Sequence, residues 1–363
     1  MKEPNLLSHV TQTQLLLLLE AVVGVPIASL ASEALPGIEQ GCSGGDQHLA
    51  RFLYTARDGR SGEVTLFVKR CAWKRRSEAV HYRHLAARGV PTPRLYGALR
   101  NDSGEEIIFL EPLTATDFRS DSEEEWRAML SLLARLNTCA ITPDYAPHLH
   151  RYEQVGRIAG NTWILGLDAS PANEELEASL RACSVRDSES LALQQAARAL
   201  FAQVAAQPRG LLHQDYLSNN LDWRGEREEL VVFDLHKNAL GPRFADVAPY
   251  LALPDWSDSA AFLDGAENGT VSRRERLTRH YLDEYARFGG PAVSLRTFRE
   301  ESAALSWSHK VAALPWLAKE KQQARIREVL DCLRQVPLSA GRALRAKGET
   351  APVARLPRNR RSG

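Results

Sequence analysis

Two stretches near the middle of the chain decide how the sequence is interpreted. Residues 211–221 read LLHQDYLSNNL, and residues 231–236 read VVFDLH. In the first stretch an apolar strand leads into a histidine and an aspartate, and an asparagine follows five residues after that aspartate. In the second, a strongly β-forming run ends in another aspartate. Transfer of a phosphoryl group to a hydroxyl needs such parts: a carboxylate that accepts the proton and oxygen ligands for Mg²⁺.

On this interpretation Asp215 is the candidate general base, and Asn220 and Asp234 are the candidate magnesium ligands. Mg²⁺ prefers hard oxygen donors and commonly takes only one or two protein carboxylates. The alternative is an ordinary polar turn, because Asp and Asn between strands most often hydrogen-bond to nearby backbone. Taken by itself the stretch favours the polar turn, so the upstream sequence has to decide between the two.

The upstream feature is a lysine at the end of an apolar strand. Residues 67–69 read FVK, and an ammonium in such a place is costly to bury without a partner. Glu78, near the start of the following helix, is the candidate partner. Strand alternation ends on Lys69, which separates it from its basic neighbours at 70 and 74–76. The alternatives are a surface lysine and an exposed Glu78 that is favoured only by the helix dipole.

The order of predicted elements gives a small α+β part followed by a helix-rich part. A helix is expected from Thr11, which forms a capping box with Gln14, to a stop at Gly24. Further along we expect strands at 48–55, 64–69, 94–99, 107–110 and 230–234, and helices at 77–88, 122–136, 174–207, 272–288 and 296–335. The boundary is expected near 113–119, where an apolar strand gives way to polar turn residues.

Composition limits the function classes. The 363 residues are 44% hydrophobic and 25% charged, as in a globular protein, and the net charge of +1 gives no reason to expect nucleic-acid binding. Residues 340–363 carry seven Arg and Lys residues and one Glu, which is typical of a solvated, disordered tail. The leucine run 15–19 is too short for a membrane span, and the five cysteines form no metal-binding pattern. We expect a cytoplasmic protein without a membrane partner.

Taken in order, these motifs resemble the aminoglycoside phosphotransferase and choline kinase group of small-molecule kinases. The resemblance spans most of residues 37–335. It rests on His213-x-Asp215-x-x-x-x-Asn220, on Phe233-Asp234, on GPRFADVA at 241–248, and on Glu78 followed by YRHL at 82–85 and GVPTPRLYG at 89–97.

The resemblance implies an α+β, two-lobed protein-kinase-like fold, with a small antiparallel-sheet N-lobe and a larger, mainly helical C-lobe. Residues 1–113 would be the nucleotide-binding lobe, preceded by the extra N-terminal helix. Residues 114–338 would be the catalytic and substrate-binding lobe, and residues 339–363 the basic tail.

The resemblance also implies roles for individual residues. Asp215 would be the catalytic base, and His213 would brace its loop. Asn220 and Asp234 would hold Mg²⁺, while Lys69 would bind phosphates and be oriented by Glu78. Asp246 is expected to be architectural. The connector 109–113 would hold the adenine. Its candidate contacts are Glu111 and Leu113, with Leu113 as the donor because Pro112 has no N–H.

A glycine-rich segment is the remaining candidate for the nucleotide. Its backbone could approach phosphates as nests do, with Ser43 adding a hydroxyl, although a simple hairpin turn would look the same. The candidate residues are Gly41, Ser43, Gly44 and Gly45.

Two departures from the family's pattern stand out. Gln214 replaces the usual glycine, and Leu235-His236-Lys237 follows the second aspartate where Phe-Gly or Trp-Glu is common. His236 and Lys237 could contact phosphates or an anionic substrate, or could be ordinary turn residues. Acids and tryptophans of the helical part would suit a cationic acceptor, unless they form only the solvated face of helices. These are Asp255, Trp256, Asp258, Asp283, Glu284, Trp307, His309 and Trp316.

The expected function is therefore an Mg²⁺-dependent phosphotransferase. It would move the γ-phosphate of ATP, or GTP, to a hydroxyl of an aminoglycoside-like compound, another antibiotic or a natural-product intermediate. The alternative is a kinase-like regulatory module, a pseudokinase, that binds nucleotide without transfer. The presence of Lys69, Asp215, Asn220 and Asp234 favours the enzyme. The missing His-Arg-Asp, Asp-Phe-Gly and Ala-Pro-Glu elements disfavour a protein kinase. The protein is expected to be a monomer or a homodimer.

Overall fold

The computed structural model describes residues 10–35, 47–71, 77–100, 104–113, 121–152, 170–183, 185–252, 263, 271–312 and 314–335. They fall into two compact units, one drawn from 1–160 and 207–306 and the other from 161–206 and 307–363. Several predicted features lie outside the described residues: the glycine-rich segment 41–45, the acceptor candidates Asp255, Trp256 and Asp258, the side chains of His309 and Trp316, and the tail 339–363.

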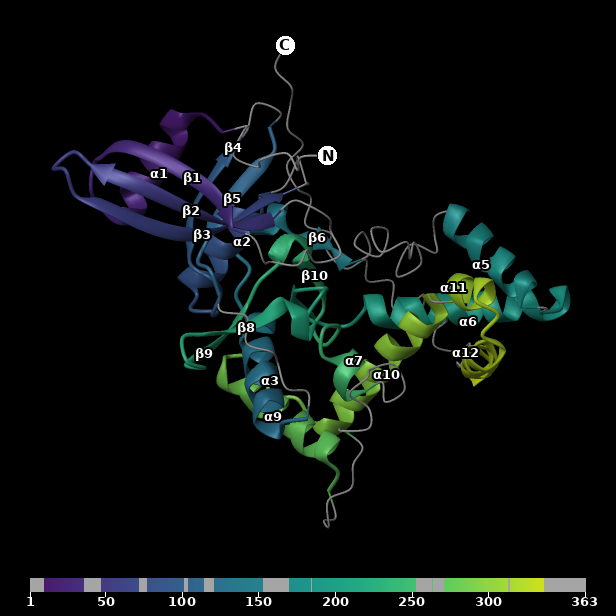
Figure 1. The fold of residues 1–363 in the computed structure, drawn as a ribbon. Coiled ribbons are helices and arrows are strands. Elements are labelled where there is room, and N and C mark those ends of the chain that lie inside the picture. The colour runs from purple at the N-terminus through teal and green to yellow at the C-terminus, as the bar shows by residue number, and fades with distance from the viewer. Residues whose placement is uncertain are drawn as a thin grey trace. The chain divides into compact units, whose positions relative to one another are not determined.

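A five-stranded antiparallel sheet forms the N-terminal part of the first unit (Figure 1). Its strands, in spatial order, are β1 Ile27–Leu35, β2 Gln47–Ala56, β3 Ser61–Cys71, β5 Glu106–Leu110 and β4 Leu95–Arg100. Four of these strands were predicted. The edge strand β1 was not, because most of its residues are exposed and carry no clear alternation; pairing with β2 alone defines it.

Helix α1, Gln12–Val23, packs on this sheet. It begins at the predicted capping box of Thr11 and Gln14 and ends at Gly24, whose φ of 74° suits glycine. Its leucines join one apolar cluster with Phe52, Leu66 and Phe109 of the sheet. Gly97 of β4 allows this packing, because a Cβ there would lie 2.5 Å from Leu18.

Helix α2, Glu78–Ala87, is held at its first turn by the sheet. The N-cap residue Ser77 makes no capping bond with its own side chain. Instead Glu106 of β5 accepts hydrogen bonds from the Ser77 hydroxyl and, at 3.2 Å, from the backbone N–H of Ala79. The Glu106 carboxylate therefore caps the N-terminus of α2 and fixes the position of Glu78 in its first turn.

The remainder of the first unit combines helices with short strands. Helix α3, Glu123–Asn137, packs along α9, Arg273–Arg287 (Figure 1). Strands β6 His150–Arg151, β10 Ala239–Pro242 and β7 Arg209–Leu212 form one small sheet, and β8 Leu221–Arg224 with β9 Glu229–Val232 forms a hairpin. The short helices are η2 Ala146–His148, η3 Ser218–Asn220, η4 Leu235–Lys237 and α7 Ala248–Leu251.

The second unit is helical. Helix α11 packs on α5 and α12, and α12 also packs on α6. The bounds are α5 Ser170–Ala182, α6 Asp187–Ala205, α11 Leu314–Lys319 and α12 Gln323–Gln335, while α10, Leu295–Ala312, begins in the first unit. The helical stretches predicted at 174–207 and 296–335 are thus broken into two and three helices.

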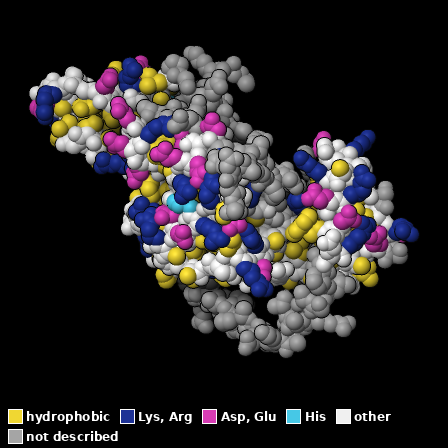
Figure 2. Space-filling view, turned by 90° about the horizontal axis from the view of Figure 1, so that it is seen from below, with side chains coloured by type: hydrophobic (Ala, Val, Ile, Leu, Met, Phe, Trp, Pro, Cys, Tyr) yellow, Lys and Arg dark blue, Asp and Glu magenta, His cyan; other side chains and the backbone are white. Residues whose placement is uncertain are grey.

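The predicted α+β class is confirmed, with an antiparallel sheet over 27–110 and mainly helices after residue 121. The division into lobes at residue 113 falls within the first unit and stays a prediction. None of the described helices is long and apolar enough to cross a membrane. On the face shown in Figure 2, basic and acidic side chains intermingle.

A buried asparagine joins α3 to α9 and to β7. The Asn137 amide donates to the Leu211 carbonyl at 2.8 Å and to Asp246 Oδ2 at 3.4 Å, and its oxygen accepts from the Tyr281 hydroxyl at 2.9 Å. Only 3% of Asn137 is exposed. Because water cannot replace these partners, the three hydrogen bonds fix the place from which β7 leads into the next loop.

Replacing Asn137 by Ala should therefore destabilise the first unit. The change strands the Leu211 carbonyl and the Tyr281 hydroxyl, and a buried unsatisfied polar group costs about 1–3 kcal/mol. We expect the free energy of unfolding, measured by urea denaturation, to fall by about 2–5 kcal/mol. The control Tyr281→Phe removes one bond and should cost about 1–2 kcal/mol; equal losses in the two variants would contradict the central place of Asn137.

Candidate active site

The β8–β9 hairpin brings two of the predicted residues together. Leu221 of β8 pairs with Val232 of β9, so the residues just outside this pair face each other. The Phe233 N–H donates to the Asn220 carbonyl at 3.1 Å. Asp234 follows directly, so the two predicted magnesium ligands emerge from the same end of one hairpin.

The loop before the hairpin is closed by Asn220 itself. Its Nδ2 donates to the backbone carbonyl of Asp215 at 2.7 Å. The amide oxygen Oδ1 receives no hydrogen bond from any described residue and remains available as a ligand atom. The spacing of five residues between Asp215 and Asn220 thus has a structural cause.

Asp246 fixes the first part of this loop. Its Oδ2 accepts from the His213 N–H at 2.7 Å, and its Oδ1 accepts from the Gln214 N–H at 3.0 Å. These bonds hold Gln214 at a φ of 70°, in the left-handed region that favours glycine. The architectural role expected of Asp246 fits this geometry. The left-handed backbone also explains why the family usually has a glycine where this chain has Gln214.

His213 braces the loop from inside the core. Its ring is fully buried; Nε2–H donates to the Phe233 carbonyl at 2.8 Å, and Nδ1 accepts from the Asp215 N–H at 3.3 Å. Burial lowers the pKa of His213, and the same burial raises the pKa of Asp246. A neutral imidazole with one donor and one acceptor fits both contacts, so both ring nitrogens of His213 are engaged in holding the loop.

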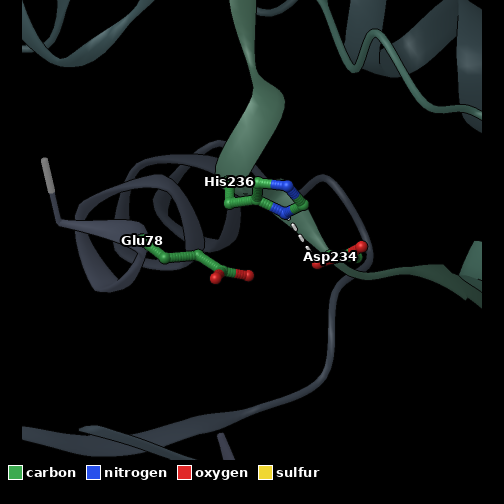
Figure 3. A group of neighbouring side chains, drawn as sticks. All are labelled: Glu78, Asp234 and His236. Carbon is green, nitrogen blue, oxygen red and sulfur yellow. Dashed lines mark hydrogen bonds and ion pairs between the residues drawn. The ribbon is translucent and has the colours of Figure 1, made fainter. Parts of the chain in front are cut away.

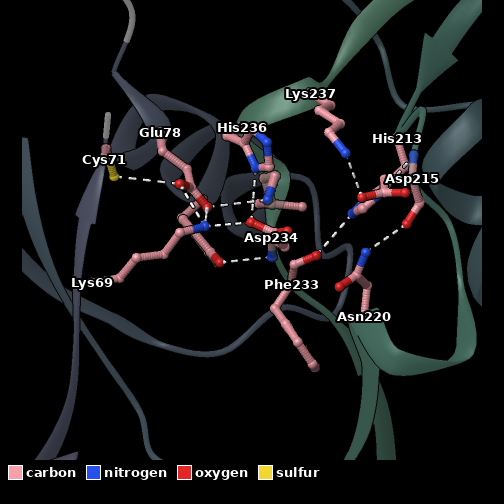
Figure 4. Close-up of polar contacts among 12 residues, drawn as sticks. Lys69, Cys71, Glu78, His213, Asp215, Asn220, Phe233, Asp234, His236 and Lys237 are labelled. Carbon is pink, nitrogen blue, oxygen red and sulfur yellow. Dashed lines mark hydrogen bonds and ion pairs between the residues drawn. The ribbon is translucent and has the colours of Figure 1, made fainter. Parts of the chain in front are cut away.

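Three segments meet at Lys69, which lies near the end of β3 (Figure 4). Its Nζ lies 3.0 and 2.9 Å from the two carboxylate oxygens of Glu78 and also contacts Asp234 Oδ1. The Glu78 side chain is only 1% exposed. It also accepts from the Leu235 N–H at 3.1 Å and from the Cys71 thiol at 3.3 Å. Glu78 is therefore a buried partner of Lys69 and not an exposed first-turn glutamate.

The charges of this group support one another. Burial by itself lowers the pKa of Lys69, but Glu78 and Asp234 outweigh it and raise that pKa above its ordinary value. Burial likewise raises the pKa of Asp234, but the hydrogen bond from His236 and the charge of Lys69 hold it well below its ordinary value. Lys69 and Asp234 are therefore both charged at neutral pH.

His236 and Lys237, two and three residues after Asp234, also turn into the site, which the sequence had left open. His236 Nδ1 lies 2.8 Å from Asp234 Oδ1, and Lys237 Nζ lies 2.7 Å from Asp215 Oδ2 (Figure 4). Asp234 has a φ of 61°, and this left-handed residue makes the turn that presents both side chains. The only sequence signal was their position beside a predicted ligand.

Ligand atoms of Glu78, Asp234 and His236 lie within 4.8 Å of one another (Figure 3). Glu78 already neutralises the Lys69 ammonium, and His236 offers nitrogen, which Mg²⁺ disfavours. Asp234 and the amide oxygen of Asn220 are hard oxygen donors at the end of one hairpin. This pair fits Mg²⁺ better than the cluster does.

The connector after β5 lines a hollow of about 270 Å³. Its walls are Glu111, Pro112, Leu113, Trp223, Arg224, Gly225 and Glu226. The carboxylate of Glu111 accepts hydrogen bonds from the Arg224 guanidinium at 2.9 Å and from the Arg94 backbone N–H at 3.0 Å. Arg224, which the sequence did not single out, therefore fixes the connector on which Leu113 lies.

Three of the acceptor candidates have side chains that the structure describes: Asp283, Glu284 and Trp307. Asp283 and Glu284 are on α9, and Arg287 pairs with Glu284 and lowers its pKa. Trp307 belongs to the second unit, where the Lys310 ammonium lies 4.5 Å from its ring centre.

Replacing Lys69 by Met should weaken the fold in a pH-dependent way. The lowered pKa of Asp234 contributes stability above the unfolded value of about 3.9, and that stability is lost as pH falls below it. Without the ammonium this contribution shrinks. The difference in unfolding free energy between wild type and variant should therefore be nearly constant from about pH 7 to about pH 5 and should shrink as the pH falls from about 4 towards about 2.

Urea denaturation at several pH values measures this difference. Arg296→Met is the control, because Arg296 and Glu300 form an exposed pair on α10 that should matter little at any pH. A Lys69 variant whose deficit stayed constant from about pH 7 down to about pH 2 would contradict the assignment.

Comparisons with known proteins agree with the motifs. The sequence profile described as "Phosphotransferase enzyme family" matches residues 54–290, more than half of the chain. A search of curated protein sequences found no significant match.

Three solved structures are similar in part. A spectinomycin phosphotransferase in complex with ADP and spectinomycin is 13% identical, with 91% of this chain and 99% of that chain covered and a TM-score of 0.43. An aminoglycoside phosphotransferase mutant with AMP-PNP and hygromycin B is 13% identical, with 87% and 95% covered and a TM-score of 0.45. Ethanolamine kinase from Plasmodium vivax is 11% identical, with 84% and 82% covered and a TM-score of 0.42.

The region matched by the family profile includes the strand of Lys69, the loop of Asp215 and Asn220, and the hairpin that Asp234 follows. The chain therefore belongs to the phosphotransferase enzyme family, the small-molecule kinases that its sequence motifs resemble.

Proposed function

We propose that this phosphotransferase moves the γ-phosphate of ATP to a hydroxyl group of a small molecule in an Mg²⁺-dependent reaction. The observation that carries the proposal is the convergence of Asp215, Asn220 and Asp234 beside the Lys69–Glu78 pair. Phosphoryl transfer depends on positioning and charge stabilisation, and these residues supply both.

Lys69 supplies the fixed positive charge. Its ammonium is held by the two carboxylates, so little conformational freedom is lost when it also contacts the α- and β-phosphates. Glu78 keeps the lysine in place and ties it to the backbone of Leu235. The nucleotide would therefore meet an ammonium that is already oriented.

Mg²⁺ would be held by Asp234 and the Oδ1 of Asn220, where it would neutralise charge on the phosphates. The other end of Asn220 is tied to the Asp215 carbonyl, so the ligand atom and the base share one rigid loop. The donor chemistry and the open amide oxygen support this choice of residues.

Asp215 is the proposed general base. Its carboxylate would accept the hydroxyl proton while the acceptor oxygen bonds to the γ-phosphorus and the bond from that phosphorus to the ADP oxygen breaks. The side chain is 26% exposed, so a substrate can reach it. His213 and Asp246 hold the loop and take no part in the bond changes.

The nucleotide's base would lie at the connector, with the Leu113 N–H as donor. The hollow beside Leu113 supports a binding role for this segment. A phosphate contact from Gly41, Ser43, Gly44 and Gly45 stays a prediction. ATP rather than GTP is the proposed donor, and calorimetric titration with each nucleotide compares them directly.

The acceptor is proposed only as a small molecule with a free hydroxyl. ATP consumption measured across aminoglycosides, macrolides, nucleoside antibiotics, choline and aminosugars identifies the class. Nucleotide binding without transfer to any of these compounds would favour the pseudokinase alternative, against which the retained Lys69, Asp215, Asn220 and Asp234 count.

Replacing Asp215 by Asn should lower kcat about 10²- to 10⁴-fold, because the amide cannot take the proton. Mg-ATP affinity, measured by calorimetry, should stay within about twofold of wild type. The matched control is Asp58→Asn, which makes the same change in the exposed turn between β2 and β3 and should alter neither quantity. Substantial turnover by the Asp215 variant would remove this residue from the base role.

Replacing Asp234 by Ala should weaken nucleotide binding on the order of tenfold or more when Mg²⁺ is present. Binding of ATP in EDTA should change much less, because only the metal-dependent part is lost. Calorimetry with and without Mg²⁺ measures both, and Asp58→Ala serves as the control. An unchanged Mg-ATP affinity would rule Asp234 out as a ligand.

A further inference from the structure

A second ammonium lies directly on the proposed base. Lys237 Nζ is 2.7 Å from Asp215 Oδ2, and the two side chains are 27% and 26% exposed (Figure 4). Pairs with this much solvent access contribute little to stability. The contact with Asp215 is therefore of interest for what it does to the proposed base, and not for its contribution to stability.

The backbone around Lys237 cannot easily move away. The Leu235 N–H donates to Glu78, and the Asn238 N–H donates to the Leu235 carbonyl at 3.0 Å. The His236 carbonyl is bonded to the His150 ring at 3.1 Å, and Asn238 is wholly buried. With its turn tied on both sides, Lys237 starts from a fixed point, and its long side chain bends back to Asp215.

Lys237 occupies only one oxygen of the base. Among the residues that the structure describes, no other side chain bonds to the Asp215 carboxylate, and none donates to Oδ1. The terminal torsion of an aspartate is broad, so a carboxylate without a partner samples many orientations. A general base must point one lone pair at the proton that it accepts.

We propose that Lys237 is a positioning residue of the transfer reaction. Its ammonium holds Oδ2 of Asp215, and Oδ1 is thereby directed toward the hydroxyl of the acceptor. The inference rests on the proposed function, in which Asp215 is the base.

Crystal structures of wild type and Lys237→Met at one pH test the contact without any activity. The wild type should show the ammonium on Oδ2 and a single carboxylate orientation. In the variant, whose side chain has similar length and no charge, the carboxylate should rotate or occupy two orientations. A wild type without the contact, or a variant with an unchanged carboxylate, would overturn the proposal.

Kinetics test the consequence, with Mg-ATP and the best acceptor from the panel above. Lys237→Met should lower kcat about 10- to 100-fold through loss of orientation. The KM for ATP should stay within about twofold, and Lys237→Arg should recover part of the rate. Lys321→Met, which removes an exposed lysine of the second unit, should behave as wild type. A raised KM for ATP with an unchanged kcat would show nucleotide binding instead of positioning.

A double-mutant cycle separates positioning from a general structural effect. If Lys237 acts through the Asp215 carboxylate, Lys237→Met should change nothing further in the Asp215→Asn background. Fully additive losses, or a large drop in melting temperature of Lys237→Met alone, would contradict the proposal. Failure of the wild type to phosphorylate any compound would count against the proposed function, whereas the crystallographic comparison decides the Lys237 contact by itself.

Discussion

The pairing of the Lys69 ammonium with Glu78 and Asp234 is the interaction on which the rest of the site depends. The partners lie 9 and 165 residues away along the chain, on α2 and just after β9. Because an unpaired ammonium is costly to bury, all three segments must stay together for the fold to keep it. Strand, helix and hairpin end are thereby fixed around one charge, and the Glu78 bond to Leu235 adds a backbone tie.

A second constraint operates a few residues away, where backbone strain is held by buried polar groups. Gln214 and Asp234 both have left-handed backbone, which costs energy for residues other than glycine. Asp246 compensates the first through two backbone N–H groups. Since the backbone N–H and both ring nitrogens of His213 have hydrogen-bond partners, the buried network holds this loop in one conformation.

Local signals made a large part of this predictable. The capping box of Thr11, the apolar strand ending near Lys69 and the helix starting beside Glu78 each lie within a few residues, where physical chemistry acts along the chain. Strand β1 was not predicted because it is an exposed edge strand, whose conformation depends on its pairing with β2. The helical stretch at 296–335 was predicted without its two breaks, although Pro315, next to the first of them, is a residue that disfavours a helix interior.

The sequence by itself determined the order of the motifs, and this order indicated the family. These motifs are the lysine strand, the acidic helix start, the Asp215–Asn220 spacing and the strand ending in Asp234. The tertiary structure decided which side chains these residues meet. It buried Glu78, committed Glu111 to Arg224 and turned Lys237 onto Asp215. The direction of a side chain depends on groups brought near it from distant segments, and no local pattern of residues records those contacts.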